Sequence, residues 1–239
     1  MLETSPRLYA RVTGLLWLIV IVTGAYTMFA LRTPALVPGD AATTAKAVLA
    51  AVNIYHTSLI VDLISTVSYT GVTVFFFLLL KPANSAIAAL AAAFGLMGLI
   101  IGLTNLAVHQ GPLALMTNAA QLGVYSLAQL QTFALALIKI ENLVFAVAML
   151  LFGCQCFLNG TVVLRSGYFP WFLGVLLMLT GIAYVANFLT GLLAPALSHA
   201  LFPVVAVAGF GGEGGMSLWL LLVGVNREKW FARKAAAPA

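Results

Sequence analysis

The chain has 239 residues, of which 63% are hydrophobic and only 7% are charged. A soluble globular domain carries about 25% charged residues, so this composition excludes a water-soluble fold and indicates a protein that lies in a lipid bilayer. The net charge of +5 does not indicate a nucleic-acid partner, because no basic stripe interleaved with aromatic residues lies on a soluble face.

The first apolar run predicts a membrane span over residues 12–31. Ser5 and Pro6 are typical of an N-cap followed by a first-turn proline, so we expect the helix to begin before the membrane. A basic start followed by an apolar run is also the pattern of a signal peptide. We interpret the run as an anchor, because about 20 residues cross a bilayer and five similar runs follow.

An outer loop is predicted over residues 32–54, where prolines and a glycine break the chain. Asp40 is placed to cap a short helix over 41–53, which we interpret as interfacial because its apolar and polar residues fall on opposite faces. The second span, 55–80, carries a polar stripe at helical spacing that should face protein or water. The stripe consists of Ser58, Asp62, Ser65, Thr66, Tyr69 and Thr73.

The third span is predicted over 86–108, with glycines at helical spacing that indicate a packing seam ending at Asn105 and His109. A second outer loop with a short amphipathic segment should occupy 109–125. The fourth helix, 126–158, would be about 50 Å long against a hydrocarbon core of about 30 Å, so it must protrude, tilt or break.

The fifth and sixth spans are predicted over 169–192 and 199–225, and a basic tail follows them. Counting outward from Asn159 and Gly160 places Lys139 and Glu141 at the outer boundary of the membrane. The same count from Lys81 places Asp62 near that boundary. Glu213 falls deeper, roughly 20 Å from the inner face.

The Lys and Arg residues predict the orientation, because basic residues are concentrated in cytoplasmic segments. Six spans with both termini in the cytoplasm leave only Arg32 and Lys46 clearly outside, with Lys139 at the outer boundary. We therefore predict a multi-pass protein of the bacterial inner membrane. The basic residues placed in the cytoplasm are Arg7, Arg11, Lys81, Arg165, Arg227, Lys229, Arg233 and Lys234.

Glu213 is the strongest candidate for a functional residue, because an ionisable side chain deep in a membrane span is costly. It lies in GFGGEGG, residues 209–215. The glycines allow two interpretations. They let a neighbouring helix approach through the small-residue pairs Ala208/Gly212 and Gly211/Gly215, or they loosen the helix to free backbone groups for a ligand. The simpler alternative is a tightly packed helix in which a protonated Glu213 bonds to a neighbour.

The remaining reactive residue types give weaker signals. Cys154 and Cys156 point to nearly opposite sides of a helix, so we interpret them as small apolar side chains. The sequence has no nucleophile elbow, phosphate-binding loop, dinucleotide fingerprint or HExxH motif, and it identifies no cofactor. No metal is favoured. The weak candidates for metal ligands are His56, His109 and His199, which fall at outer helix ends near Asp62 and Glu141.

Several strings spread over nearly the whole chain resemble one bacterial family of integral membrane proteins, the domain of unknown function 4386. This resemblance implies a six-helix inner-membrane architecture and no particular activity. Asp62 and Glu213 match acidic positions of the family pattern, whereas Glu141 stands where a histidine is expected and His56 where an arginine is expected. The strings are LVPGDAATTAKAVLA (36–50), LIVDLI (59–64), LLLKPANS (78–85), LLFGCQCFLNGTVVLRSGYFPWFLGVLLMLTGIAYV (150–185) and GGEGGMSLWLLLVG (211–224).

We therefore predict an all-α protein with one domain, residues 1–239, of six transmembrane helices and two short outer interfacial helices. Its polar residues should line a cavity that opens outward, with Lys139 beside it as a ligand contact or an ion-pair partner of Asp62 or Glu213. The residues predicted to line the cavity are Asp62, Asn105, Glu141, Tyr184, Asn187 and Glu213.

Three functions fit this architecture. The first is binding, or movement, of a small or amphiphilic ligand. The second is an intramembrane enzyme in which Glu213 or Asp62 acts as a general acid on a lipid-like substrate such as an isoprenoid. The third is a structural or signalling partner without a ligand. Membrane lipid is the expected surrounding, and a stand-alone transporter of this size would need a second copy of the chain.

Overall fold

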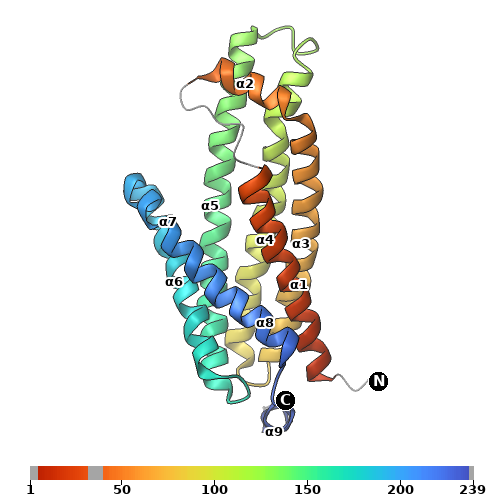
Figure 1. Cartoon of the computed structure of the whole chain (residues 1–239), viewed down its shortest axis with the longest axis vertical. Helices are drawn as coiled ribbons and strands as arrows, with labels where there is room; N and C mark the ends of the chain where they lie inside the picture. The colour runs from red at the N-terminus through yellow and green to blue at the C-terminus, as the bar shows by residue number, and fades with distance from the viewer. Residues whose placement is uncertain (1–4, 32–39, 237–239) are drawn as a thin grey trace. The chain divides into compact units, whose positions relative to one another are not determined.

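The computed structural model describes residues 5–31 and 40–236, apart from the side chains of Met28 and His199, and it is helical throughout these ranges except for turns (Figure 1). The all-α prediction is therefore confirmed. The predicted break at Pro34, Pro38 and Gly39 lies outside the described residues. The helices are α1 (Pro6–Tyr26), η1 (Thr27–Leu31), α2 (Ala41–Ala50), α3 (Val52–Leu80), α4 (Ser85–Thr117), α5 (Leu127–Ser166), α6 (Trp171–Leu193), α7 (Pro195–Gly209), η2 (Phe210–Gly214), α8 (Gly215–Leu222) and α9 (Arg227–Ala236).

Six helical segments are long and apolar enough to cross a membrane, which confirms the predicted number of spans. The short helices η1 and η2 are π-helical turns that continue α1 and join α7 to α8, so they interrupt neither the first span nor the sixth. The segments are Pro6–Leu31, Val52–Leu80, Ser85–Thr117, Leu127–Ser166, Trp171–Leu193 and Ala200–Leu222.

The third span continues beyond the predicted end at residue 108, which corrects the predicted loop over 109–125. Helix α4 runs through His109 and Pro112 to Thr117, so the short amphipathic segment expected in the loop is the end of this helix. A proline within a membrane helix is tolerated where neighbouring groups satisfy the freed backbone. Pro112 is itself buried, and packing thus overrides its tendency to end a helix.

The fourth helix also continues beyond its predicted end, because Asn159 and Gly160 are packing residues and not a helix stop. A Cβ atom on Gly160 would lie 2.6 Å from the carbonyl oxygen of Gly174 in α6, so the bare glycine allows the two helices to touch. Helix α5 ends at Ser166. The helix axis between Glu141 and Ser166 is therefore about 37 Å long. This distance is greater than the one predicted by counting from Asn159.

The chain divides into two compact units. Unit 1 contains Met1–Ile21, Val67–Leu99 and Val147–Ala239, and unit 2 contains Val22–Thr66 and Ile100–Ala146. Helices α1, α3, α4 and α5 each contribute residues to both units, and α6 to α9 belong to unit 1.

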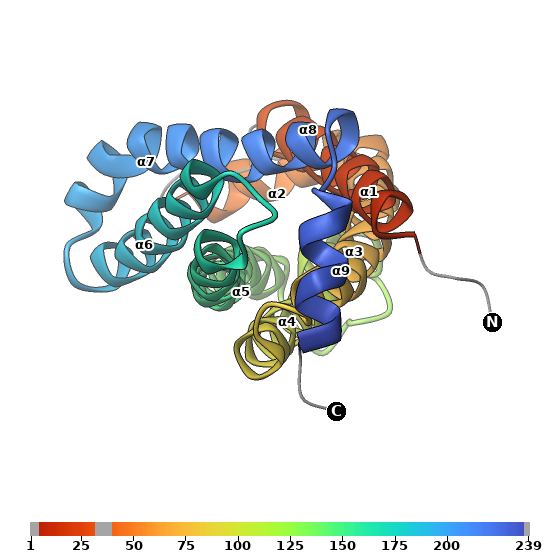
Figure 2. The same cartoon turned by 90° about the horizontal axis from the view of Figure 1, so that it is seen from below.

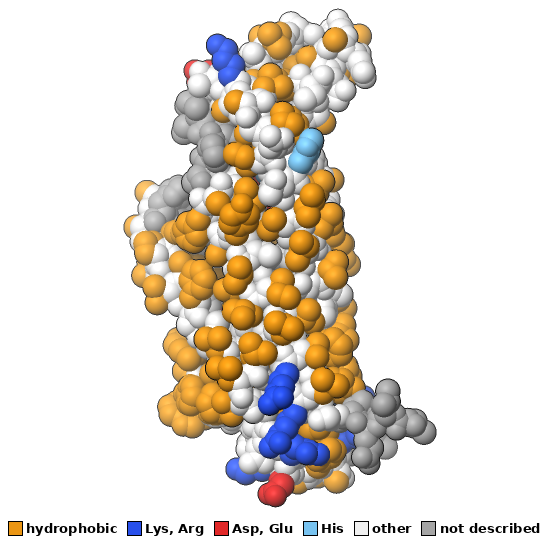
Figure 3. All heavy atoms as spheres, turned by 45° about the vertical axis from the view of Figure 1, so that its right-hand side comes forward, with side chains coloured by type: hydrophobic (Ala, Val, Ile, Leu, Met, Phe, Trp, Pro, Cys, Tyr) orange, Lys and Arg blue, Asp and Glu red, His pale blue; other side chains and the backbone are white. Residues whose placement is uncertain are grey.

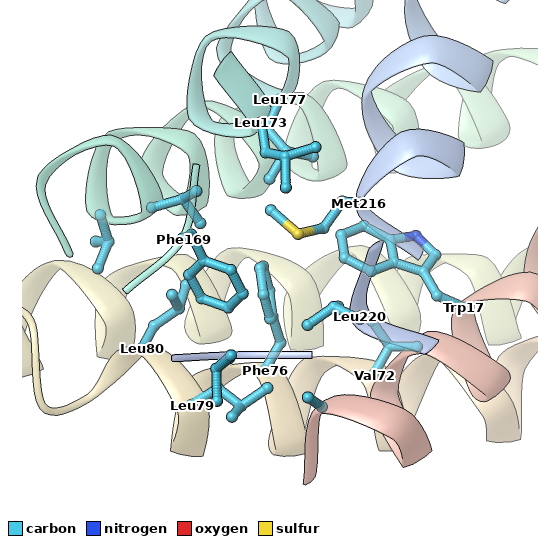
Figure 4. Packing of buried hydrophobic residues seen from close by; sticks show 14 of the residues in the cluster. Trp17, Val72, Phe76, Leu79, Leu80, Phe169, Leu173, Leu177, Met216 and Leu220 are labelled. Atoms are coloured by element: carbon cyan, nitrogen blue, oxygen red, sulfur yellow. The ribbon is translucent and has the colours of Figure 1, made fainter. Parts of the chain in front are cut away.

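The core of unit 1 is built from aromatic and long aliphatic side chains. Trp17 of α1 meets Phe76 of α3 edge-on, with ring centroids 5.3 Å apart. Figure 4 shows Phe76, Met216 and Leu220 pointing into one space between α3, α6 and α8, where all three side chains are fully buried. This packing anchors α8, and with it the polar turn η2 that precedes it.

Helix α9 is attached to unit 1 by hydrogen bonds as well as by apolar contact. The indole Nε1 of Trp230, a buried residue, donates to the carbonyl oxygen of Leu79 at 3.0 Å, and Figure 2 shows α9 against this end of α3. The hydroxyl of Tyr168 donates to the same carbonyl at 2.8 Å. Burial raises the pKa of Tyr168 above its ordinary value, so this hydroxyl keeps the proton that it donates.

Unit 2 has its own core, in which the short helix α2 packs on parts of α3, α4 and α5. Val48 of α2 is fully buried in this core. The predicted N-cap is confirmed, since the Asp40 carboxylate accepts a hydrogen bond from the backbone N–H of Thr43 at 2.9 Å. Other buried members of the core are Ala45, Tyr55, Leu113, Met116, Leu130, Ala134 and Ile138.

Candidate functional site: the Glu213 cluster

The stretch around Glu213 forms the π-helical turn η2 between α7 and α8. Its flanking residues Gly209 and Gly215 have helical backbone angles, with φ of −61° and −60°. The glycines therefore do not break the helix; they accompany a wider turn within it. Such π-helical turns are rare and occur frequently at functional sites, which supports the selection of Glu213.

One of the two predicted small-residue pairs packs against a neighbouring helix. A Cβ atom on Gly212 would lie 2.7 Å from the carbonyl oxygen of Leu176 in α6 and would also meet the hydroxyl of Thr180. That hydroxyl donates to the carbonyl oxygen of Ala208 at 2.6 Å, so the predicted Ala208/Gly212 contact is confirmed.

The second pair has no close neighbour among the described residues. No described atom lies within 4 Å of a Cβ placed on Gly211 or Gly215, so the structure shows no helix of the described ranges packed against this pair. Gly211 is exposed and Gly215 is half-buried, which leaves one side of η2 without a covering side chain from the described residues.

The Glu213 carboxyl accepts hydrogen bonds from α5 and α6. The hydroxyl of Tyr184 donates to Oε2 at 2.9 Å, and the thiol of Cys156 donates to Oε1 at 3.4 Å. Gly209 makes room for this arrangement, because a Cβ atom there would lie 2.6 Å from the Tyr184 hydroxyl. We call Glu213, Tyr184, Cys156 and the nearby Trp17 the Glu213 cluster.

Trp17 of α1 completes the cluster with an indole N–H. This group lies near the Glu213 carboxyl, but no described acceptor meets it with hydrogen-bond geometry, and the residue is almost fully buried. Glu213 itself is half-buried, and its carboxyl end points into the protein. Among the residues that the structure describes, no Lys, Arg or His forms an ion pair with Glu213. The carboxyl therefore faces donors and lacks a cationic partner.

A second group of polar side chains supports the cluster from α3 and α5. The hydroxyl of Tyr69 donates to Oε1 of Gln155 at 2.9 Å, and Nε2 of Gln155 donates to the hydroxyl of Thr73 at 3.3 Å. All three residues are buried, so this part of the predicted polar stripe of the second span faces protein, as expected. Gln155 precedes Cys156 in α5, so the hydrogen bonds of Gln155 hold the part of α5 from which the Cys156 thiol projects.

Unit 2 contains a separate chain of hydrogen bonds through Glu141. Its carboxylate lies 3.0 Å from Nδ1 of His109, and Nε2 of His109 lies 2.8 Å from the hydroxyl of Ser58. The ring of Tyr55 stacks on the imidazole with centroids 4.9 Å apart. Asp62 accepts a hydrogen bond of 3.0 Å from the hydroxyl of Thr27 in η1. Each π-helical turn therefore has a hydrogen-bonded carboxyl group, Asp62 beside η1 and Glu213 within η2.

The other predicted site residues have varied surroundings. Asn105 is almost fully buried, and its Oδ1 has no hydrogen-bond partner among the described residues. Lys139 is exposed. Asn187 accepts a hydrogen bond from the hydroxyl of Ser198 at 3.2 Å. The structure thus brings Tyr184 and Glu213 into one cluster, whereas Asp62, Asn105, Lys139 and Glu141 belong to unit 2.

The histidines differ in their surroundings. His56 is exposed and His109 is buried, whereas the side chain of His199 lies outside the described residues. The described residues contain no group of three or more His, Cys, Asp or Glu side chains that could hold a metal ion.

Sequence reasoning missed Cys156, Trp17 and Gln155. Cysteine and tryptophan are counted as apolar residues in a membrane helix, so composition gave no signal for the first two. Gln155 did carry a signal, since an amide within an apolar run is expected to bond to another helix.

The six apolar helices, with polar side chains bonded between them, define a multi-pass helical membrane protein. A family model described as "Domain of unknown function (DUF4386)" matches residues 12–224. The match spans most of the chain, so the chain belongs to this family and the predicted resemblance is confirmed. Comparison with curated proteins and with solved structures gave no match to the chain.

Proposed function

We propose that this protein binds a small or lipid-like ligand at Glu213, and that the polar head of the ligand is a cation or a hydrogen-bond donor. The observation that carries the proposal is a carboxyl within a membrane span that is bonded by donors and has no cationic partner among the described residues. A charged or acidic group in such a place calls for a partner, because membrane lipid cannot solvate it.

The partial exposure of Glu213 supports access from the bilayer. Gly214, the next residue, is also half-buried and has no described atom within 4 Å of its Cβ position. An amphiphile could therefore bring its head to the carboxyl while its chain remains in lipid. The same surface is open to a second copy of the chain, so a homodimer remains compatible with the proposal. The outward-opening cavity remains a prediction.

The test uses the full chain in a neutral detergent, with dodecylamine as the cationic probe and dodecanol as its uncharged counterpart. We expect dodecylamine to raise the thermal unfolding midpoint, and Glu213→Gln to weaken its apparent affinity at least about tenfold, or about 1.4 kcal/mol. Asp40→Asn, which removes an exposed carboxylate at the start of α2 and keeps an acceptor for the helix cap, is the matched control and should change the affinity little.

Equal binding of dodecylamine by wild type and Glu213→Gln would contradict the proposal. Dodecanol binding as tightly as dodecylamine would identify the recognised head as a hydrogen-bond donor and not as a cation. If the ligand is also moved across the membrane, Glu213→Gln should abolish that movement, because amide and carboxyl differ in their ability to exchange a proton or a cation.

An intramembrane enzyme is the second candidate, and one observation favours it. Tyr184 and Cys156 place exchangeable protons directly on the Glu213 carboxyl, as acid–base chemistry on a lipid-like substrate requires. Asp62, the other predicted general acid, accepts a hydrogen bond from Thr27 within unit 2. Tyr184→Phe would then lower turnover of an added isoprenoid alcohol or phosphate without changing its binding. If neither binding nor turnover responds to these variants, the structural or signalling role is supported.

The location that we propose is the bacterial inner membrane, with both termini in the cytoplasm. The support is the distribution of basic residues, since Arg7 lies at the start of α1, Lys81 between α3 and α4, and Arg165 at the end of α5. Helix α9 adds four more Lys and Arg residues: Arg227, Lys229, Arg233 and Lys234. Concentration on one side of the spans is the pattern of cytoplasmic segments.

A further inference from the structure

An open surface pocket of about 560 Å³ lies in unit 1 where the start of α1 meets the start of α9. Side chains of both signs line it, together with one amide and one aromatic ring. Lys and Arg side chains gather around this end of α9 on the face shown in Figure 3. The lining residues are Arg7, Asn226, Arg227, Glu228 and Phe231.

The wall that α9 contributes is held in place by hydrogen bonds. Oδ1 of Asn226 accepts a hydrogen bond from the backbone N–H of Lys229 at 3.1 Å and caps the helix. The backbone N–H of Asn226 donates to the carbonyl oxygen of Tyr168 at 3.3 Å. Trp230 anchors the next turn through its bond to Leu79. The guanidinium of Arg227 is therefore presented from a fixed helix and not from a free tail.

The charges that line the pocket favour an anion. Arg7 and Arg227 contribute two guanidinium groups against the single carboxylate of Glu228. Within residues 5–31 and 40–236, no ion pair joins Glu228 to either arginine, so Glu228 neutralises neither guanidinium group. The planar fork of a guanidinium matches two oxygens of a phosphate group, and basic pockets at the cytoplasmic side of membrane helices bind lipid headgroups.

The size and the remaining residues specify the anion further. A volume of about 560 Å³ is within the range of sites for small organic ligands and exceeds what a phosphate ion needs. The Glu228 carboxylate accepts hydrogen bonds, so it can pair with a ligand that carries a hydroxyl or an ammonium. The ring of Phe231, which is 44% exposed, offers an apolar wall beside these polar groups.

We propose that this pocket binds a phosphodiester lipid headgroup, with the phosphate between Arg7 and Arg227 and a hydroxyl or ammonium of the headgroup bonded to Glu228. Phosphatidylglycerol and phosphatidylethanolamine have this chemistry. Phosphatidylcholine has the phosphodiester but no donor, and free phosphate lacks the rest of the headgroup. The site is separate from the Glu213 cluster and does not depend on the function proposed there.

The test measures lipid bound to the detergent-purified full chain by native mass spectrometry, with each of these lipids and inorganic phosphate added in turn. We expect retention of phosphatidylglycerol or phosphatidylethanolamine in preference to phosphatidylcholine. The double variant Arg7→Gln/Arg227→Gln should weaken that binding at least tenfold. Lys81→Gln/Lys229→Gln removes the same charge outside the pocket, and it should change the binding less than twofold.

Glu228→Gln should reduce the preference for phosphatidylglycerol over phosphatidylcholine and leave phosphate recognition in place. Competition by millimolar inorganic phosphate would identify the ligand as a free phosphate compound. Equal losses in the two double variants would overturn the proposal in favour of general surface attraction, and unchanged binding in Arg7→Gln/Arg227→Gln would overturn it outright. If the double variant fails to fold, the single variant Arg7→Gln, at an exposed position, replaces it.

Discussion

The hydrogen bonds around Glu213 depend on backbone positions where a side chain would not fit. Gly212 allows η2 to lie against the carbonyl of Leu176, and Gly209 leaves space for the Tyr184 hydroxyl. The two glycines thus position the carboxyl for its donors. Gly211, one residue before Gly212, has no comparable neighbour among the described atoms and provides an internal control.

Gly212→Ala should destabilise the protein by about 1–3 kcal/mol, because the new methyl group must displace a backbone carbonyl of α6. Gly211→Ala adds the same methyl group in open space, so it should be neutral or slightly stabilising through helix propensity. Thermal unfolding in detergent compares the two variants. Similar midpoints for both would show that η2 does not lie against α6 as closely as the structure places it.

The sequence located Glu213 as the central residue, because the cost of a buried carboxyl can be judged from its position in the chain. It could not supply the partners. Cys156 and Tyr184 are distant from Glu213 in sequence, and their hydrogen bonds exist only because α5 and α6 pack against η2. Residue type predicts that a polar group needs a partner, whereas helix packing determines which partner it has.

At the scale of the element, helix starts were predicted better than helix ends. Asp40 begins α2 through a local hydrogen bond to Thr43, which depends on a few neighbouring residues and is therefore visible in the sequence. Pro112 and Asn159 are signals for helix ends that tertiary packing overrides. Both lie inside longer helices, because leaving the helix within a membrane would expose unpaired backbone groups.

The cap at Asp40 should make α2 sensitive to acid. The side-chain and backbone hydrogen bonds from Thr43 lower the pKa of Asp40 below its ordinary value of about 4. A lowered pKa means that the cap contributes its full stability above the ordinary value and loses it as the pH falls through the lowered one. Hydrogen exchange of residues 41–50, corrected for intrinsic rates, should show α2 losing protection in that range.

Asp40→Asn keeps an acceptor for the cap but does not titrate, so its exchange should not change over the same pH range. Asp40→Ala should expose α2 to exchange already at neutral pH. If wild type and Asp40→Asn respond equally to acid, another group is responsible for the pH dependence.

At the scale of the whole molecule, six crossings of the membrane would return the chain to the side on which it started, so we predict that both termini lie on one side of the membrane. The basic residues at the helix ends predict that this side is the cytoplasm. Ala42 in α2 and Ala235 in α9 are exposed positions on opposite sides of the membrane in this arrangement. Single cysteines at these two positions test the orientation.

In intact cells, a membrane-impermeant maleimide should label Ala42→Cys strongly and should reach Ala235→Cys only after the membrane is permeabilised. The native thiols of Cys154 and Cys156 lie within α5, so the unaltered chain measures any background labelling. Strong labelling at Ala235→Cys with none at Ala42→Cys would reverse the orientation. The lipid-headgroup pocket at the start of α9 would then face the outer leaflet, and the leaflet in which its lipid is sought would change accordingly.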